Sequence, residues 1–396
     1  MALNILYINN VDISGPTGPG TNERMFIQTF LSKSDHHFVI TKKQRRSKQR
    51  IRHTRLLENY SDEFTSTYGR LRYMSNVLLE KLKGDSTLRN YKKLLNRNGA
   101  MDLVIMRVDN MRFVSFVDEL IASQVPLAIR HFHKWLDGLN ENKKHRLLKM
   151  LKYACYVDTT WRKMQQFLEA KHGIITEVKD NAIDLSLFPK VSGKGEFKKS
   201  LGFSSNHFVI GYIGGFPYER GGELIIKSAK KLLGINKDFR FVIIGDAKNK
   251  VAKGINEVKM LIKEHELEPY FFTKGYVPFD SVYNYFAALD VGVALVPYEV
   301  ARDIGNSSQK IYQYLATGSI PMSPLDTHQS LETDGMAMSY HYKGVDEFSE
   351  LIVKEYQNSK SDAEKCEERF NYVLNHKEIN SSITQLLNRI LALINA

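Results

Sequence analysis

The sequence contains little cysteine and no long apolar run. Two cysteines, Cys155 and Cys366, are too few for a disulfide framework or a cysteine-based zinc site, so a reducing compartment is expected. No apolar run approaches the ~20 residues that cross a bilayer, and the opening MALNILYINN has no signal-peptide pattern. We therefore expect a cytoplasmic protein that is either soluble or peripheral on the inner face of the membrane.

Positive charge is in excess and partly concentrated in one stretch. Lys and Arg number 56 against 44 Asp and Glu, a net charge of +12. Between Lys42 and Arg55 there are eight Lys or Arg and no acid. Such a patch can meet nucleic acid, anionic lipid or an acidic polymer, and a solvated loop can have the same composition. Because no nucleic-acid recognition motif accompanies it, we expect an anionic membrane surface or a lipid-linked acceptor as partner, and no nucleic acid.

Apolar runs of strand length alternate with helical segments along the chain. This alternation is typical of α/β domains with parallel sheets. With 396 residues, 43% of them apolar, the chain is long enough for two such domains. The predicted strands are Leu3–Ile8, His36–Thr41, Asp102–Arg107, Val125–Arg130, Ala154–Thr159, His207–Gly215, Arg240–Asp246, Tyr270–Gly275 and Val291–Val296. We predict an α/β protein with two Rossmann-like, doubly wound domains.

The same pattern predicts the domain boundaries. Residues 1–185 form the first domain, with a basic helical insertion at about 42–97, and residues 186–375 form the second. The polar, glycine-containing stretch Val191–Ser200 has the composition of a linker. Residues 376–396 are expected to form a C-terminal helix that packs back toward the first domain.

A glycine-containing loop follows the first predicted strand. It reads GPTGPGTN and includes Gly15, Gly18 and Gly20, and a helix is expected to begin just after it. Glycines between a strand and a helix let backbone amides approach an anion closely. The loop lacks the GxGxxG dinucleotide fingerprint, so by itself it is a weak indication of a phosphate site.

The stretch Val277–Pro324 is the most informative part of the chain. A predicted strand is followed by an irregular loop, and Ser307 or Ser308 can then cap a helix that ends at Gly318. Lys310 and Gln313 lie three residues apart, so they share one face of its first turns. A cation and an amide there suit a nucleotide diphosphate and its ribose. The alternative is an ordinary helix with a solvated lysine.

Two histidines follow the predicted strand Val125–Arg130. They lie in the sequence RHFHKW, where the carboxyl end of a parallel strand places functional loops. His131 or His133 can position a hydroxyl or a phosphate there, although a lone histidine is more often structural. None of the 12 histidines forms a recognisable metal motif, and we expect no metal and no cofactor.

Several short motifs together resemble a known family. They are NAIDLSLF from residue 181, IGYIGGFPYERGGELIIKSA from 210, VIIGD from 242, ALDVGVALVP from 288 and SSQKIYQYLATGSIPM from 307. In this order they resemble the markers of the retaining glycosyltransferases of family 4, within the glycosyl transferases group 1. The resemblance implies the GT-B architecture, in which two Rossmann-like domains face each other across a cleft.

The resemblance also implies roles for particular residues. Arg220 occupies the place of a lysine that binds the donor diphosphate, and Lys310 matches a second diphosphate-binding lysine. Gln313 and Gly305 stand where the family has two glutamates, and Gly215 stands where many members have an arginine. The implied catalytic residues are Arg220, Lys310 and His131. The implied donor-binding residues are Gly18, Gly20, Gly214, Gly215, Gly245, Ser307, Ser308 and Gln313. Glu299, Asp303 and His133 are the alternatives in the same loops.

The implied activity is metal-independent transfer of a sugar, with retention, from a UDP- or GDP-sugar to a glycan or lipid-linked acceptor. Cell-surface polysaccharide or glycoconjugate synthesis is the expected setting. Arg220, Lys310 and the helix N-termini at Gly222 and Ser308 would stabilise the charge on the leaving diphosphate. One alternative is a sugar-nucleotide epimerase of the same architecture. The other is a non-catalytic binding or scaffold protein, which Gly305 and Gln313 favour.

Overall fold

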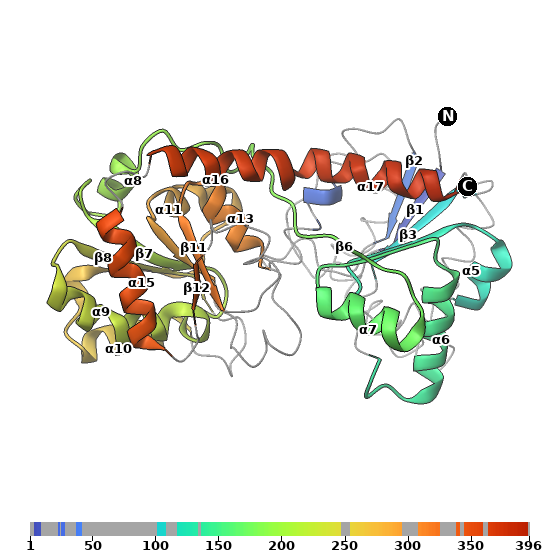
Figure 1. Ribbon diagram of the computed structural model, residues 1–396, viewed down its shortest axis with the longest axis horizontal. Helices are drawn as coiled ribbons and strands as arrows, with labels where there is room; N and C mark the ends of the chain where they lie inside the picture. The colour runs from blue at the N-terminus through green and yellow to red at the C-terminus, as the bar shows by residue number, and fades with distance from the viewer. Residues whose placement is uncertain are drawn as a thin grey trace, which may run out of the picture. The chain divides into compact units, whose positions relative to one another are not determined.

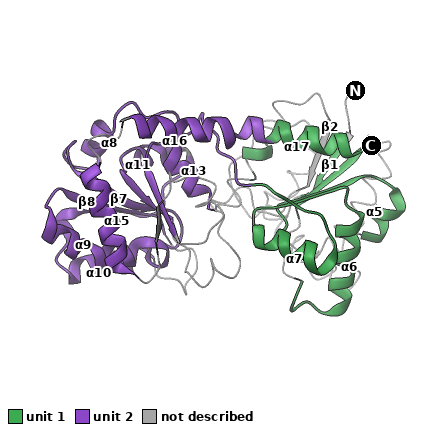
Figure 2. Cartoon of the chain, in the orientation of Figure 1, with its two compact units in different colours: residues 1–179, 383–396 green, residues 180–382 purple. Residues whose placement is uncertain are grey.

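The computed structural model describes residues 4–8, 23, 25–27, 37–41, 101–107, 117–133, 136–246, 254–294, 308–324, 338–340, 344–358 and 363–394. The chain divides into two units, shown in different colours in Figure 2. Unit 1 comprises residues 1–179 and 383–396, and unit 2 comprises residues 180–382. Within the described ranges, each unit contains one six-stranded parallel sheet (Figure 1).

The sheet of unit 1 has the strand order β2-β1-β3-β4-β5-β6. Its strands are β1 (Asn4–Ile8), β2 (His37–Thr41), β3 (Leu103–Arg107), β4 (Leu127–Arg130), β5 (Tyr156–Thr159) and β6 (Glu177–Val178). The register pairs Tyr7 with Ile105 and Arg107 with Arg130. Because every pairing is parallel, the carboxyl ends of these strands lie at one edge of the sheet. Ligands of open α/β sheets bind at that edge.

Helices cover the sheet of unit 1 because its central strands β3 and β4 are apolar up to their final arginine. The helices are α5 (Val117–Ser123), α6 (Glu141–Tyr153), α7 (Arg162–His172) and the part of α17 (Ile379–Ile394) from residue 383 onward. One core layer joins Leu6, Val104 and Ile129 of the strands to Leu147 and Leu168 of α6 and α7. Asn140 caps α6 by accepting from the backbone N–H of Lys143.

The sheet of unit 2 has the strand order β12-β11-β10-β7-β8-β9. Its strands are β7 (Phe208–Ile213), β8 (Phe239–Ile244), β9 (Phe271–Lys274), β10 (Val291–Val293), β11 (Ile320–Pro324) and β12 (Met338–Tyr340). All six residues of β7 are buried, as expected for a central strand of a parallel sheet.

Helices lie on both faces of this sheet (Figure 1). They are α8 (Gly195–Ser200), the π-helical turn η3 (Tyr218–Gly222), α9 (Glu223–Ile235), α10 (Ile255–Glu264), α11 (Tyr283–Ala287), α13 (Gln309–Ala316), α15 (Val345–Asn358), α16 (Ala363–His376) and the start of α17, with short 3₁₀ turns at Glu268–Tyr270 and Phe279–Ser281. One core layer contains residues of α9, α10 and α15, and the other contains residues of α11, α13 and α16. No helix in the described ranges has the length and apolar composition needed to span a bilayer.

The predicted α/β fold is confirmed, and each of the nine predicted strands is present with ends shifted by at most a few residues. The linker prediction is wrong for residues 195–200, which form helix α8 inside unit 2. Lys198 in this helix is buried because its Nζ lies 2.7 Å from Asp290 Oδ2 and donates to the carbonyl of His207. The polar, charged composition of this segment is therefore explained by a largely buried ion pair rather than by an exposed linker.

The unit boundaries differ from the predicted ones. Unit 2 begins at residue 180 rather than 186, because Asp180 and Ile183 already bond to unit 2 residues. Residues 376–382 belong to unit 2, and residues 383–396 cluster with unit 1. The predicted insertion at about 42–97, including the basic stretch Lys42–Arg55, lies outside the described residues.

Candidate functional site

Helix α13 places Lys310 against the turn that follows strand β7. The Lys310 side chain lies beside Gly214, whose φ is +152°, and a Cβ at this position would collide with the lysine side chain. The Nζ atom of Lys310 lies 5.5 Å from the ring centroid of Tyr212. The positive φ favours glycine at this position, and any larger residue would also force the end of the Lys310 side chain to move.

Arg220 reaches the same place from the π-helical turn η3. The turn contains non-helical backbone at Arg220 and at Gly221, where φ is +145°. The Arg220 guanidinium carbon lies 5.3 Å from the ring centroid of Phe216, which itself has a positive φ of 60°. Unusual backbone of this kind often accompanies functional loops. The non-helical backbone of the sequence YERGG therefore directs the Arg220 side chain differently from a residue in the first turn of a regular helix.

Lys310 and Arg220 form a pair of like charges. Burial, and then the nearby Arg220 guanidinium, lower the pKa of Lys310 from 10.5 to about 8. Across the described ranges, no ion pair joins either side chain to an acid. Two cations held close together without a carboxylate cost free energy unless an anion is present. This arrangement suits a phosphate or diphosphate.

The remaining predicted residues of unit 2 surround this pair. Gly245, with φ of +134°, approaches the backbone of Gly214 so closely that a Cβ would collide with it. Gly215 is exposed, and its carbonyl accepts from the Tyr212 hydroxyl at 2.5 Å. Gln313 is buried on α13, and Ser308 is the N-cap residue of that helix. The structure thus brings Gly214, Gly215, Gly245, Arg220 and Lys310 to one end of the sheet.

The predicted helix N-terminus at Gly222 is displaced, because the turn η3 already begins at Tyr218. The Gly222 N–H donates to the carbonyl of Pro217 at 2.8 Å, within a turn that continues directly into α9. Because the turn starts before the helix, this amide is already satisfied and cannot bind a phosphate oxygen.

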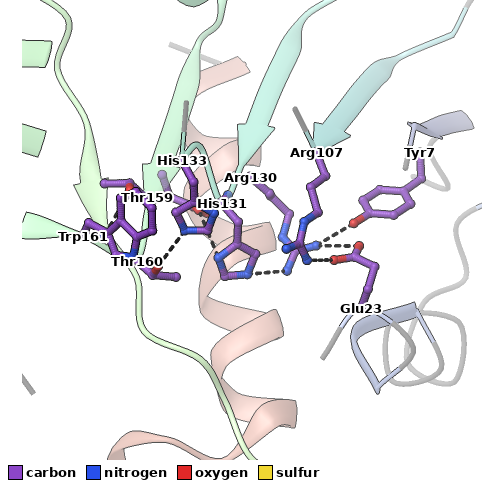
Figure 3. Close-up of polar contacts among 10 residues, drawn as sticks. Tyr7, Glu23, Arg107, Arg130, His131, His133, Thr159, Thr160 and Trp161 are labelled. Carbon is purple, nitrogen blue, oxygen red and sulfur yellow. Dashed lines mark hydrogen bonds and ion pairs between the residues drawn. The ribbon is translucent and has the colours of Figure 1, made fainter. Parts of the chain in front are cut away.

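A second polar cluster lies at the carboxyl ends of β1, β3 and β4 in unit 1 (Figure 3). The carboxylate of Glu23 accepts from Arg107 at 2.6 Å and from Arg130 at 3.3 Å. Arg130 also donates to the Tyr7 hydroxyl at 2.7 Å and lies over the ring of Phe26. All these side chains are buried, so Glu23 compensates part of the charge of two desolvated guanidinium groups.

His131 is held in one tautomer by this cluster. Its Nε2 lies 3.2 Å from Nη2 of Arg130, and a guanidinium can only donate, so Nε2 must be the acceptor. Burial and the positive charge of Arg130 lower the pKa of His131 well below its usual value. The ring is therefore neutral and carries its proton on Nδ1, which lies 4.0 Å from Asp158 Oδ1. In this arrangement the lone pair of Nε2 is already used by Arg130.

The backbone of His131 is also fixed. Its φ is +49°, and its N–H donates to Asp158 Oδ1 at 2.6 Å. Burial raises the pKa of Asp158 to about 6, against the lowering effect of Arg130. A left-handed backbone held by a buried carboxylate indicates a tightly specified turn.

His133 lies beside a different set of groups. Its Nε2 is 2.6 Å from Oγ1 of Thr160, and its ring is 4.6 Å from that of Trp161 (Figure 3). Burial, and then Arg107, lower the pKa of His133 to about 3. Both histidines are thus neutral near pH 7. His133 is less buried than His131, so it is the better placed of the two to meet a substrate.

Sequence analysis missed the buried partners of these histidines. Glu23, Arg107, Arg130 and Asp158 were not singled out, and neither was Tyr212 in unit 2. A signal was available, because Arg107 and Arg130 each end an otherwise apolar strand. Five predicted residues lie outside the described ones: Gly18, Gly20, Glu299, Asp303 and Ser307. In the part of the chain that is described, no three His, Cys, Asp or Glu are grouped to hold a metal ion.

Comparisons with known proteins agree with this fold. Residues 193–301 match the family model described as Glycosyl transferases group 1. This segment lies within unit 2 and includes Arg220, but it stops before Lys310. The match supports the expectation of a glycosyltransferase. No curated protein matches the sequence.

Several solved structures resemble the whole chain. A glycosyltransferase from Rickettsia africae has a TM-score of 0.72 at 13% identity, covering 99% of each chain. Sucrose-phosphate synthase from Thermosynechococcus elongatus has a TM-score of 0.70 at 12% identity, covering 98% of this chain and 99% of that one. HepE from Anabaena, in complex with UDP and glucose, has a TM-score of 0.67 at 14% identity, covering 98% and 100%. The chain therefore has the α/β fold of GT-B glycosyltransferases, with parallel sheets in two Rossmann-like units.

Proposed function

We propose that this protein is a glycosyltransferase that binds the diphosphate of a nucleotide sugar at Lys310 and Arg220. One observation carries the proposal: at the carboxyl end of the unit 2 sheet, Lys310 lies beside Gly214 and 5.5 Å from the Tyr212 ring, where the charge of Arg220 acts on it. Among the described residues, no ion pair joins either cation to an acid. The match to glycosyl transferases group 1 over residues 193–301 supports it. The complexes of HepE with UDP and with UDP-glucose support a nucleotide-sugar donor.

The chemistry follows from where charge develops. Breaking the bond between the sugar and the nucleotide leaves negative charge on the diphosphate, and groups fixed there stabilise the transition state more than the ground state. Arg220 and Lys310 supply two such positive charges. A bound diphosphate favours the protonated form of Lys310, which offsets the cost of holding two cations together.

We further propose that transfer proceeds with retention and without a metal, as in family 4. His131 has its acceptor nitrogen occupied by Arg130, so it is not the base that deprotonates the acceptor. The leaving phosphate, on the same face of the sugar, is the proposed proton acceptor. We propose UDP- or GDP-sugars as donors and a glycan or lipid-linked molecule as the acceptor. The basic stretch Lys42–Arg55 is proposed to dock the protein on an anionic membrane or a lipid-linked acceptor.

The proposal is tested by replacing one diphosphate contact. Arg220→Ala should lower transfer from a UDP- or GDP-sugar by roughly two orders of magnitude, since a charge-assisted phosphate contact contributes ~2 to 3 kcal/mol. The matched control is Lys231→Ala, which removes a cation paired with Asp346 on the surface of the same unit. Transfer near the wild-type rate in Arg220→Ala would contradict the assignment.

A further inference from the structure

The chain enters and leaves unit 2 through two segments that are bonded to each other. The unit boundaries fall at residues 179/180 and 382/383. Close to both boundaries, Ile183 N–H donates to the carbonyl of Lys377 at 2.8 Å, and Ile379 N–H donates to the carbonyl of Ile183 at 2.9 Å. Lys377 Nζ also donates to Asp180 Oδ2 at 2.8 Å. We call these two segments, 180–183 and 377–379, the crossing segments.

Helix α13 is tied to the same place by two side chains. The hydroxyl of Tyr312 donates to Asp180 Oδ2 at 2.7 Å, so one carboxylate oxygen accepts from both Tyr312 and Lys377. Gln309 Nε2 donates to the carbonyl of Ala182 at 3.1 Å. The Asp180 and Lys377 side chains are only 6% and 13% exposed, so their ion pair is shielded from solvent and sensitive to geometry.

The residues that reach the crossing segments adjoin those of the proposed donor site. Gln309 and Tyr312 are three apart and share one face of α13, while Lys310 and Gln313 are each one position further along. The helix is eight residues long, and Ile311, Tyr314 and Leu315 are fully buried. A short, tightly packed helix moves as a unit. A shift that brings Lys310 toward a ligand therefore also shifts Tyr312 at Asp180.

We propose that Asp180 is a positioning residue that couples the donor site to the crossing segments through Tyr312. A diphosphate held by Lys310 fixes α13, and α13 in turn orders the two segments through which the chain passes between its units. The inference rests on the proposed function, because it requires a nucleotide diphosphate at Lys310. By linkage, loosening the Asp180 contact must weaken nucleotide binding by the same factor by which nucleotide stabilises the contact.

The test is amide hydrogen exchange of Ile183 and Ile379, whose N–H groups form the bonds between the crossing segments. UDP is the probe, with GDP in parallel, and each protein is held at the same multiple of its own dissociation constant. In the wild type we expect bound nucleotide to slow exchange at both amides by about tenfold, as for a local opening that a ligand suppresses. In Tyr312→Phe the slowing should be largely lost, and the dissociation constant should rise by several-fold to about tenfold.

Tyr356→Phe is the matched control. It removes a tyrosine hydroxyl that donates to Asp238 elsewhere in unit 2, so it should leave both readouts as in the wild type. Gln309→Met removes the second tie to the crossing segments and serves if Tyr312→Phe does not fold. It should give a smaller loss of slowing in the same direction, because an uncharged acceptor is involved.

The outcomes separate the two proposals. If neither UDP nor GDP binds the wild type, the proposed function and the coupling both fail. If nucleotide binds but the two amides exchange at the same rate with and without it, the coupling fails and the proposed function stands. Equal slowing in the wild type, Tyr312→Phe and Gln309→Met would also overturn the coupling, because nucleotide would then act without these contacts.

Discussion

Each unit has a pair of basic side chains at the carboxyl end of its parallel sheet. The two pairs differ in whether a carboxylate compensates their charge. In unit 1 the guanidinium groups of Arg107 and Arg130 share the buried carboxylate of Glu23. In unit 2 Lys310 and Arg220 have no acidic partner within the described ranges, and the pKa of Lys310 falls to about 8. The first pair is compensated within its own unit, whereas we propose that the second is stabilised by an anion from outside.

The largest predicted effect on stability comes from removing the compensating acid in unit 1. Glu23→Gln removes the carboxylate that the two buried guanidinium groups share, so the free energy of unfolding should fall by about 3 to 5 kcal/mol. Urea denaturation measures this change. Asp118→Asn is the control, because Asp118 pairs with Lys149 at the exposed surface, where the solvent screens the pair, and its loss should change the free energy of unfolding little. Similar effects of both variants would show that the Glu23 cluster does not hold unit 1 together.

The corresponding change in unit 2 should act on binding rather than on folding. Lys310→Met removes a charge that Arg220 repels, so the free energy of unfolding should be unchanged or slightly higher. The affinity for UDP or GDP should fall by roughly 30- to 100-fold, the value of one charge-assisted phosphate contact. Calorimetric titration and urea denaturation measure the two quantities, with Lys227→Met as the control because Lys227 pairs with Glu223. If Lys310→Met lowered the stability but not the affinity for nucleotide, Lys310 would support the fold of unit 2 rather than bind a ligand.

The lowered pKa of Lys310 predicts a pH dependence of binding. A diphosphate requires the protonated lysine, and in the free protein that form is lost as the pH rises through about 8. Between pH 7 and pH 9 the affinity for UDP should therefore fall by about tenfold. Lys310→Arg should flatten this profile, because arginine stays protonated in that range. A flat profile in the wild type would mean that Lys310 does not bind the nucleotide.

The smallest predicted effect concerns the neutral histidines of unit 1. The folded pKa of His133 is about 3, below the value near 6.5 of an unfolded histidine. The unfolded state therefore binds the extra proton, and stability falls as the pH drops below about 6.5. His133→Gln should reduce the loss between pH 7.5 and pH 6 by about 0.8 kcal/mol.

Thermal or urea denaturation at the two pH values checks this prediction. Asp158 acts in the opposite direction, because its raised pKa lets the folded state hold a proton below about pH 6. The comparison with His133→Gln isolates the histidine, since Asp158 is the same in both proteins. An unchanged loss in the variant would show that His133 is protonated in the folded protein.

The strands were predictable because their signals are local. Continuous apolar runs such as FVIGYI predict buried strands wherever they occur, and the glycines after β7 indicate a close approach of backbone to another group. Lys310 could be placed on a helix face from spacing alone. Its proximity to Gly214 and Arg220 needed the fold, because 90 residues or more separate these positions in the sequence.

The unit 1 cluster could not be predicted because its partners are distant and its charges are hidden. Glu23 and Arg130 are 107 positions apart and meet only where neighbouring parallel strands end. Lys198 in the supposed linker illustrates the same limit, because its buried partner Asp290 follows it by more than 90 residues. From sequence alone a charged residue is predicted to be exposed, because its distant partner of opposite charge is known only from the fold.

The central claim is that Lys310 and Arg220 bind a nucleotide diphosphate. Isothermal titration of UDP and GDP, without added metal, into the wild type, Lys310→Met and Arg220→Ala tests it most directly. We predict that one of the two nucleotides binds the wild type and that both variants remain folded but bind it at least tenfold more weakly. Equal affinity in all three proteins, or no binding of either nucleotide to the wild type, would contradict the claim.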